Sequence, residues 1–310
     1  MRPNNLTKLS QMVATLVAAP EHFIDLEVVA GFIRRFPIKR YIWLEENRAI
    51  DFFYETSEMD SLAVTLKEEV KDFPYDLFIQ TVDHRQKKLL IADMESTIIE
   101  QEMLDELADI IGLRHQVAAI TRRAMNGELD FKEALGARVA LLKGLSESVL
   151  WQVAERITMM PGATQLVATM RRMGAQCWLV SGGFTWFANP VGQRLGFNKV
   201  YANELMIHNQ HILGEVLEPI LDKESKKTYL EKACHILGIP LSQSLAVGDG
   251  ANDIPMLRFC HEANGLGVAY HAKPNVRAVI PHQINYSDLT ALLYAQGISR
   301  RDFVTSSFQT

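Results

Sequence analysis

Two acidic segments that lie far apart in the chain contain the residues best suited to chemistry: DMEST at positions 93–97 and VGDGAND at positions 247–253. Each directly follows a short apolar run, which is typical of a buried strand in a parallel sheet. Open α/β folds place their ligand sites at the carboxyl ends of such strands, so we expect both segments at one crevice. The carboxylates that this arrangement would bring together are Asp93, Glu95, Asp249 and Asp253.

Carboxylates crowded into one crevice cannot all stay ionised unless a cation compensates their charge. A hard divalent ion such as Mg²⁺ satisfies this need, because it binds through a few carboxylates together with a substrate phosphate. The two acidic segments therefore predict a magnesium site and, with it, phosphoryl transfer.

The residues that surround these segments predict an α/β fold. Short apolar runs alternate with helical stretches, as in the βαβ units of a parallel sheet. From residue 100 to about residue 158 the periodicity is helical throughout. A helical block is therefore inserted after the first strand and is expected to cover the carboxyl edge of the sheet. Strands are expected at residues 89–92, 176–181, 200–202, 245–249 and 265–270, and a hairpin at residues 204–207 and 212–216.

The first 85 residues predict a separate small α/β module. Helices are expected at residues 9–16 and 59–70, and strands at residues 41–44 and 49–54. The polar segment 83–88 is typical of a linker, so we place the boundary near residue 85. One domain then covers residues 1–85 and the other covers residues 86–310. No residue of the module by itself indicates a ligand.

Composition limits the partners and the compartment. The net charge of −5 and the absence of any Lys or Arg run longer than a pair argue against a nucleic acid or a membrane as partner. A small polar substrate is the better expectation. Three cysteines without close spacing predict neither a disulfide framework nor a zinc site, which fits a reducing cytosol. The N-terminus lacks an apolar signal core, and no segment approaches the roughly 20 apolar residues that span a bilayer. We therefore expect a soluble, cytoplasmic protein whose oligomeric state stays open, a homodimer included.

Four separated motifs resemble the haloacid dehalogenase superfamily and, within it, the phosphoserine phosphatases. In chain order they are DMEST at 93–97, SGG at 181–183, Lys226 and GDGAND at 248–253. The segments ITRRAMNG at 120–127 and RVALLK at 138–143 are similar to the phosphoserine subgroup in particular. The resemblance covers about residues 88–296. It implies a doubly wound parallel sheet with a helical cap at about residues 100–160. Some relatives carry an amino-acid-binding regulatory domain, of which the N-terminal module is a candidate reduced form.

The resemblance implies a Mg²⁺-dependent phosphatase that hydrolyses O-phospho-L-serine to L-serine and phosphate, the last step of serine biosynthesis. Asp93 is then the nucleophile, since a carboxylate divides the hydrolysis into two easier displacements through an aspartyl-phosphate. Glu95 is the implied general acid and base, because strand-like spacing points it to the same side as Asp93. The implied metal ligands are Asp93, the backbone carbonyl of Glu95, Asp249 and Asp253.

Phosphate binding and substrate choice fall to residues outside the acidic pairs. Ser181 and Gly182 begin a Ser-Gly-Gly turn that allows backbone amides to approach a phosphoryl oxygen. Lys226 would neutralise charge in the transition state, and the resemblance alone selects it over Lys223 and Lys227. The remaining implied contacts are Asn252 for the phosphate, Glu102 and Arg138 as the anion and cation of an amino-acid pocket, and Met125 and Phe131 as its apolar wall.

Glu95 departs from the family pattern, in which this position is typically Asp. Three functions therefore stay open: the phosphoserine phosphatase, a related phosphatase or phosphotransferase acting on another small phosphomonoester, and a catalytically impaired phosphoserine-binding protein. The pair Glu102 and Arg138 argues against the second function. Retention of the nucleophile argues against the third, since a phosphate sensor does not need it; the retained residues are Asp93, Lys226, Asp249 and Asp253.

Overall fold

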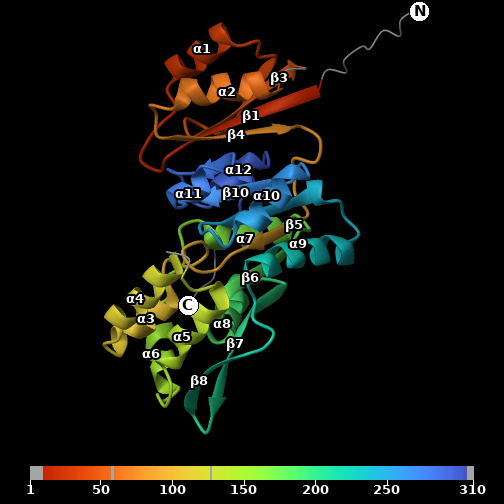
Figure 1. The fold of residues 1–310 in the computed structure, drawn as a ribbon. Helices are drawn as coiled ribbons and strands as arrows, with labels where there is room; N and C mark the ends of the chain where they lie inside the picture. Colours follow the sequence, from red (N-terminus) through yellow and green to blue (C-terminus); the bar gives the residue numbers. More distant parts are fainter. Residues whose placement is uncertain (1–9, 57–58, 126–127, 306–310) are drawn as a thin grey trace, which may run out of the picture.

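The computed structural model describes residues 10–56, 59–125 and 128–305, which form two sheets (Figure 1). The N-terminal module, from β1 to β4, has a four-stranded sheet with the order β2-β3-β1-β4. The C-terminal domain, from β5 onward, has a seven-stranded sheet with the order β11-β10-β9-β5-β6-β7-β8. In Figure 1 the module lies beside β10, α11 and α12, and helices α3 to α6 lie at the opposite end of the molecule.

The N-terminal module is an antiparallel sheet with both of its helices on one face. Strand β1 pairs with β3 and β4, and β2 pairs with the outer side of β3. Phe32 of α1 and Leu66 of α2 pack with Leu16 of β1 and Phe52 of β3 in one apolar core. The elements are β1 (Ser10–Ala18), α1 (Leu26–Arg35), β2 (Arg40–Glu45), β3 (Ala49–Thr56), α2 (Met59–Val70) and β4 (Tyr75–Thr81).

The helix expected at residues 9–16 is wrong, because the described part of this segment belongs to strand β1. Residue 9 lies outside the described residues. Leu16 faces the helices of the module, whereas Val17 packs into the core of the C-terminal domain. A strand that is buried on both faces shows no polar alternation, so periodicity cannot distinguish its apolar run from a helical one. The expected strands at 41–44 and 49–54 and the helix at 59–70 are confirmed, while α1 and β4 were not predicted.

Strand β5 is the centre of the C-terminal sheet and the point at which the strand order reverses. The chain runs from β5 to β6 and β7 on one side, and from β9 to β10 and β11 on the other, which confirms the doubly wound fold. The residues expected as separate strands at 200–202 and 204–207 form one strand, β7, which also makes the expected antiparallel hairpin with β8. The strands are β5 (Leu89–Ala92), β6 (Gln176–Phe184), β7 (Lys199–His208), β8 (His211–Leu217), β9 (Ser244–Gly248), β10 (Leu266–Tyr270) and β11 (His282–Ile284).

Helices cover both faces of the C-terminal sheet. Leu89 and Ile91 of β5 pack with α9, α10 and α11, whereas Leu90 and Ala92 pack with α7, α8 and α12, because alternate residues of a strand point to opposite faces. These helices are α7 (Ala163–Arg172), α8 (Thr185–Leu195), α9 (Lys223–Leu237), α10 (Ile254–Glu262), α11 (Pro274–Arg277) and α12 (Ala291–Ala295). In the described parts of the chain, every helix is too short or too polar to cross a membrane.

The chain between β5 and α7 is helical, as its periodicity predicted, and forms a cap. A bridge between Ile99 and Met159 joins the two ends of the insertion. The cap helices lie together beside β8, which α5 contacts (Figure 1). They are α3 (Met103–Ile110), α4 (Arg114–Met125), α5 (Phe131–Ala140) and α6 (Ser148–Ala154).

The connection between the module and the C-terminal domain is buried. Arg85, in the segment expected as a polar linker, donates to Asp51 Oδ1 at 2.6 Å and to the carbonyl of Ala295 at 2.8 Å. Asp76 of β4 accepts hydrogen bonds from backbone amides of the C-terminal domain, including that of Ser287 at 2.8 Å. Hydrogen-bonded buried charges of this kind hold both partners in one geometry. The module is therefore fixed against α12 and the loop that precedes it.

His282 of β11 makes this junction sensitive to acid. Its Nε2 donates to the carbonyl of Ile79 at 3.0 Å, and burial lowers the pKa of His282 to about 4, helped by the nearby positive groups. The unfolded chain, in which the pKa is near its ordinary value of about 6.5, takes up this proton first as the pH falls. The free energy of unfolding should therefore fall with pH between about 6.5 and 4.

We expect His282 to account for roughly 2 kcal/mol of the stability lost between pH 7 and pH 5. Urea unfolding at both pH values measures this loss. His282→Gln keeps a donor for Ile79, and its free energy of unfolding should fall by about 2 kcal/mol less than that of the parent between these pH values. His208 on the hairpin is exposed, so His208→Gln should behave as the parent does. Equal losses in the parent and in His282→Gln would contradict the assignment.

Candidate active site

Three carboxylates meet at the carboxyl ends of the adjacent strands β5 and β9. Asp93 directly follows β5, Asp249 directly follows β9, and Asp253 immediately precedes α10. One oxygen from each carboxylate lies within 4.8 Å of the others. Asp253 is fully buried, and its Oδ2 accepts the amide of Gly250 at 3.0 Å. Parallel pairing of β5 with β9 thus brings together residues separated by more than 150 positions.

Lys226 extends from the first turns of α9 into this cluster. Its Nζ donates to Asp93 Oδ1 and to Asp253 Oδ1, each at 2.6 Å, and the side chain is 1% exposed. The helix begins at Asp222, whose side chain accepts backbone amides of the first turn. This helix phase turns Lys226 inward, whereas Lys223 is exposed and Lys227 lies over the Phe259 ring. The geometry therefore selects the same lysine as the family resemblance.

One ammonium group does not compensate three buried carboxylates. Burial and the neighbouring carboxylates raise the pKa of Asp93 to about 8 and that of Asp249 to about 6. Burial alone would lower the pKa of Lys226, but Asp253 and Asp93 raise it above its ordinary value. A cluster of oxygen donors with excess negative charge fits a hard divalent cation such as Mg²⁺, which lowers carboxylate pKa values by binding. Asp93, Asp249 and Asp253 therefore fit the expected metal site.

The Ser181–Gly183 segment forms the wall of the site next to the cluster. Ser181 is fully buried, and its Oγ accepts the amide of Gly183 at 2.9 Å. Asn203 of β7 holds this segment in place, because its Nδ2 donates to the carbonyl of Gly182 at 2.8 Å and its Oδ1 accepts the amide of Leu221 at 2.7 Å. Asn203 was not predicted. Asn203 lies between the two strands expected at residues 200–202 and 204–207, and no motif in the sequence marks it.

Glu95 lies between Gly183 and the first helix of the cap. Its Oε1 accepts the amide of Met103 at 3.2 Å, in the first turn of α3. A side chain at position 183 would bring its Cβ to 2.8 Å from Glu95 Oε1, so the Glu95 carboxylate would have to move from its present position. Burial and the charges of Glu102 and Asp93 raise the pKa of Glu95 to about 8. This shift favours the protonated form of Glu95 in comparison with an ordinary glutamate.

The cap brings further expected residues to this place. Phe131 is the first residue of α5, and its ring lies over Gly182. A Cβ atom added at Gly182 would be 3.5 Å from the ring. Arg138 of α5 is half-buried, and its Nε donates to the carbonyl of Ala134 at 3.2 Å. Burial lowers the pKa of Arg138, and the charges of Asp105, Glu95 and Glu102 oppose this shift. Among the described residues no ion pair includes Arg138, so its terminal nitrogens are free to bind a ligand.

The other expected contacts lie at the rim. Glu102 is exposed at the start of α3, where its Oε1 accepts a hydrogen bond from Ser96 Oγ at 2.8 Å. The side chain of Asn252 lies against Gly250. A Cβ atom added at Gly250 would be 2.3 Å from Asn252 Oδ1. Met125 ends α4, but its side chain is outside the part that the structure describes.

The sequence model of the haloacid dehalogenase-like hydrolases matches residues 90–258, which contain the whole carboxylate cluster and the cap. The chain belongs to this family. Its relatives include the phosphoserine phosphatase of Albidiferax ferrireducens, 45% identical over 212 residues that cover 66% of this chain and 88% of the relative. Another is the phosphoserine phosphatase SerB2 of Mycobacterium tuberculosis, 42% identical over 216 residues that cover 70% of this chain and 52% of the relative. The chain thus spans about half of the latter's length.

Solved structures agree with this assignment. A haloacid dehalogenase family hydrolase from Salmonella enterica serovar Typhi matches with a TM-score of 0.80 at 30% identity, covering 92% of this chain and 98% of that one. A probable phosphoserine phosphatase from Vibrio cholerae matches with a TM-score of 0.73 at 30% identity, covering 96% and 89%. Because both matches cover more than nine tenths of this chain, they include the N-terminal module as well as the C-terminal domain.

Proposed function

We propose that this chain is a Mg²⁺-dependent phosphoserine phosphatase, which hydrolyses O-phospho-L-serine to L-serine and phosphate in the last step of serine biosynthesis. The observation that carries the proposal is the buried contact of Lys226 with Asp93 and Asp253, beside Asp249 and beneath the cap. This arrangement offers a nucleophile, a fixed positive charge and oxygen ligands for a cation at one sheet edge. The phosphoserine phosphatases among the relatives support the same substrate.

In the proposed reaction Asp93 attacks the phosphorus atom in line with the serine oxygen. The bond from phosphorus to the serine oxygen breaks, and protonated Glu95 donates its proton to that oxygen. Glu95 then takes a proton from water, whose oxygen attacks phosphorus, and the bond to Asp93 breaks to release phosphate. Lys226, Ser181 and the adjacent backbone amides bind the phosphoryl oxygens in both steps.

Asp93, Asp249, Asp253 and the backbone carbonyl of Glu95 would hold Mg²⁺, which supplies Lewis-acid stabilisation of the phosphoryl oxygens when it is bound. Substrate choice falls to the cap. Glu102 and the half-buried Arg138 would bind the amino and carboxyl groups of phosphoserine, and Phe131, with Met125, would shield the reacting bonds from water. Among the described residues, all three cysteines are free and buried, which supports a reducing, cytoplasmic compartment.

Phosphate release from O-phospho-L-serine, with and without Mg²⁺, tests the proposal. We expect release that depends on Mg²⁺ and is faster than release from p-nitrophenyl phosphate, which lacks the amino-acid groups. Faster release from another small phosphomonoester in a substrate panel would instead identify a related phosphatase. Saturable phosphoserine binding without release would identify the impaired binding protein.

Arg138→Ala should weaken use of phosphoserine selectively. Loss of the partner for the substrate carboxylate should cost roughly 2–5 kcal/mol in kcat/KM for phosphoserine. Hydrolysis of p-nitrophenyl phosphate should change little, because the phosphate site is untouched. The exposed Arg122→Ala, also in the cap, is the matched control and should leave both rates unchanged. Equal losses of both activities in Arg138→Ala would assign Arg138 to structure or to phosphate binding.

Glu95→Asp tests the third open function, a catalytically impaired phosphoserine-binding protein, which is favoured by the hydrogen bond that draws the Glu95 carboxylate toward Met103. Aspartate is shorter by about 1.5 Å, a large change beside the roughly 0.5 Å tolerance of a catalytic group. We expect kcat for phosphoserine to rise at least about tenfold, within the usual contribution of a general acid, with little change in KM. The effect should be smaller with p-nitrophenyl phosphate, whose leaving group needs little protonation. An unchanged or lower kcat would show that Glu95 is a competent acid and base here.

A further inference from the structure

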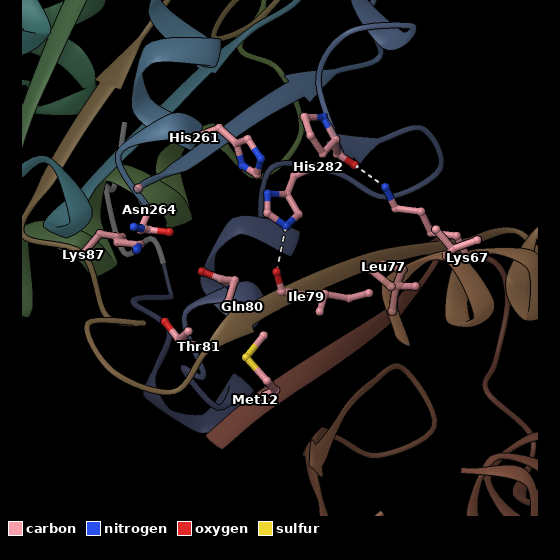
Figure 2. A pocket seen from close by; sticks show the side chains of 14 residues that line it. Met12, Lys67, Leu77, Ile79, Gln80, Thr81, Lys87, His261, Asn264 and His282 are labelled. Atoms are coloured by element: carbon pink, nitrogen blue, oxygen red, sulfur yellow. Dashed lines mark hydrogen bonds between the residues drawn. The ribbon is translucent and has the colours of Figure 1, made fainter. Parts of the chain in front are cut away.

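A cavity of about 350 Å³ lies between the N-terminal module and the C-terminal domain (Figure 2). Strands β1 and β4 and helix α2 of the module form one side, and the end of α10 and the residues around β11 form the other. Lys87, which also lines the cavity, precedes β5, whereas Asp93 follows that strand. The cavity is therefore at the opposite edge of the sheet from the active site and belongs to neither phosphate nor metal binding there.

The polar side chains of the cavity are strongly biased toward positive charge. Lys67 Nζ donates to the carbonyl of Pro281 at 3.2 Å, and Lys87 Nζ donates to the carbonyl of Ser242 at 2.8 Å. Within the described ranges, no carboxylate lines the cavity and no ion pair includes either lysine. Burial lowers the pKa of Lys87 to about 8 and also lowers that of Lys67. Lys87 is buried and Lys67 is more exposed, and among the described residues neither has a compensating anion. Burying an uncompensated ammonium group such as that of Lys87 costs free energy.

His282 supplies an independent sign of a missing partner. This side chain is 8% exposed, and its Nδ1 is buried without a hydrogen-bond partner. Because Nε2 donates to the Ile79 carbonyl, the neutral ring presents Nδ1 as an acceptor. Figure 2 shows the rings of His261 and His282 next to each other, with Lys87 on one side of the pair and Lys67 on the other. Buried polar atoms are nearly always satisfied, so the orphaned Nδ1 of this cavity-lining residue is a candidate contact for an occupant.

The module's sheet supplies most of the apolar lining. Met12, Leu77 and Ile79 line the cavity there, next to the polar Gln80 and Thr81. A ligand that satisfies the whole cavity therefore has an anionic group for the lysines, a donor for His282 and a small carbon skeleton. A volume of about 350 Å³ is near the lower limit for small-molecule sites.

We propose that this cavity is a binding site for a small organic anion, which contacts Lys87 or Lys67 through each of its anionic groups and donates to His282 Nδ1 through a hydroxyl or amino group. The bound anion joins the module to the C-terminal domain, since Lys67 belongs to α2 and His282 to β11. It also contacts two elements that lead to the active site. Lys87 is two residues before β5, which ends just before Asp93, and His261 is in the last turn of α10, which begins after Asp253.

Isothermal titration calorimetry of the full chain with succinate and with sulfate tests this site. Succinate probes carboxylate binding and sulfate probes binding of a phosphate-like oxyanion, so the two titrations distinguish the two groups. We expect at least one probe to bind with one equivalent per chain. Lys87→Met should weaken its binding at least tenfold, whereas Lys88→Met, at the adjacent exposed lysine, should bind as the parent does.

Lys67→Met provides the same test at an exposed residue whose replacement leaves the packed core intact, and it should also weaken binding at least tenfold. Circular dichroism confirms that each variant is folded. Two results would overturn the proposal: neither probe binds the parent, or a probe binds Lys87→Met and Lys67→Met as tightly as it binds Lys88→Met. The second result would place the probe elsewhere, for example at the active site. Neither titration depends on catalytic activity, so its outcome is separate from that of the proposed function.

Discussion

Asp93→Asn should reduce phosphate release from O-phospho-L-serine on the order of 10⁴-fold or more, because no aspartyl-phosphate can form without this carboxylate. The amide is nearly the same size, so Lys226 keeps its contact with Asp253 and the site keeps its shape. Release of phosphate under saturating substrate and Mg²⁺ measures the loss. Asp83→Asn, at an exposed aspartate before β5, is the control and should be as active as the parent.

The stability of Asp93→Asn separates a catalytic role from a structural one. Burial and the neighbouring carboxylates raise the pKa of Asp93 to about 8, so the charged form of this group is costly in the folded protein without metal. Replacing the carboxylate with a neutral amide should therefore leave the metal-free melting temperature unchanged or higher. The parent should gain stability on addition of Mg²⁺, and the variant should gain less. A folded Asn variant that retains more than a few per cent of parental activity would remove Asp93 from the nucleophile's role.

Lys226→Met should lower the free energy of unfolding by about 3–5 kcal/mol, the usual cost of removing one partner from a buried ion pair. The 2.6 Å contacts of Nζ with Asp93 and Asp253 are lost, while methionine preserves much of the apolar stem. The decrease in the free energy of unfolding caused by Lys226→Met should be smaller at pH 5 than at pH 8. Without the ammonium, the carboxylates gain protons in the folded state at a higher pH than in the unfolded chain, so acid relieves their repulsion.

Lys227→Met is the matched control for this variant. Lys227 is the next residue of α9, but it lies over the Phe259 ring instead of in the cluster. Its replacement should cost less than about 1 kcal/mol, as for other partly exposed cation–π contacts. Urea unfolding of the metal-free proteins compares the two variants, and phosphate release should be lost only in Lys226→Met. Equal destabilisation by both substitutions would show that the cluster does not depend on the Lys226 charge.

Local patterns in the sequence predicted the alternating strands and helices of the C-terminal domain, apart from strand β11, which was not expected. Asp93 and Asp249 each follow an apolar run, and parallel strands place their carboxyl ends at one edge, so the two residues could be predicted to meet. The helical periodicity after the first strand likewise predicted the cap, because it depends only on neighbouring residues. The same reasoning failed for β1, whose two faces are both covered by residues from distant parts of the chain.

The family resemblance named the site residues, but their contacts depend on packing between segments that are remote in sequence. The carboxylate of Glu95 was expected beside that of Asp93, and only the positions of α3 and Gly183 show that it is also held by the Met103 amide. Asn203 gained its role because β7 lies beside β6, so that its amide reaches the Gly182 carbonyl. Neither contact has a signature in the residues next to it.

The sequence by itself determined which strands end in carboxylates and where the cap is inserted, because both follow from periodicity along a single segment. Only the tertiary structure decided that Lys226, and neither of its neighbouring lysines, enters the cluster, since this depends on which side of α9 faces β5. It also assembled Lys67, Lys87 and His282 around one cavity from three separate elements. Periodicity reports the faces of one element, whereas the partner that covers each face is chosen by the packing of the whole chain.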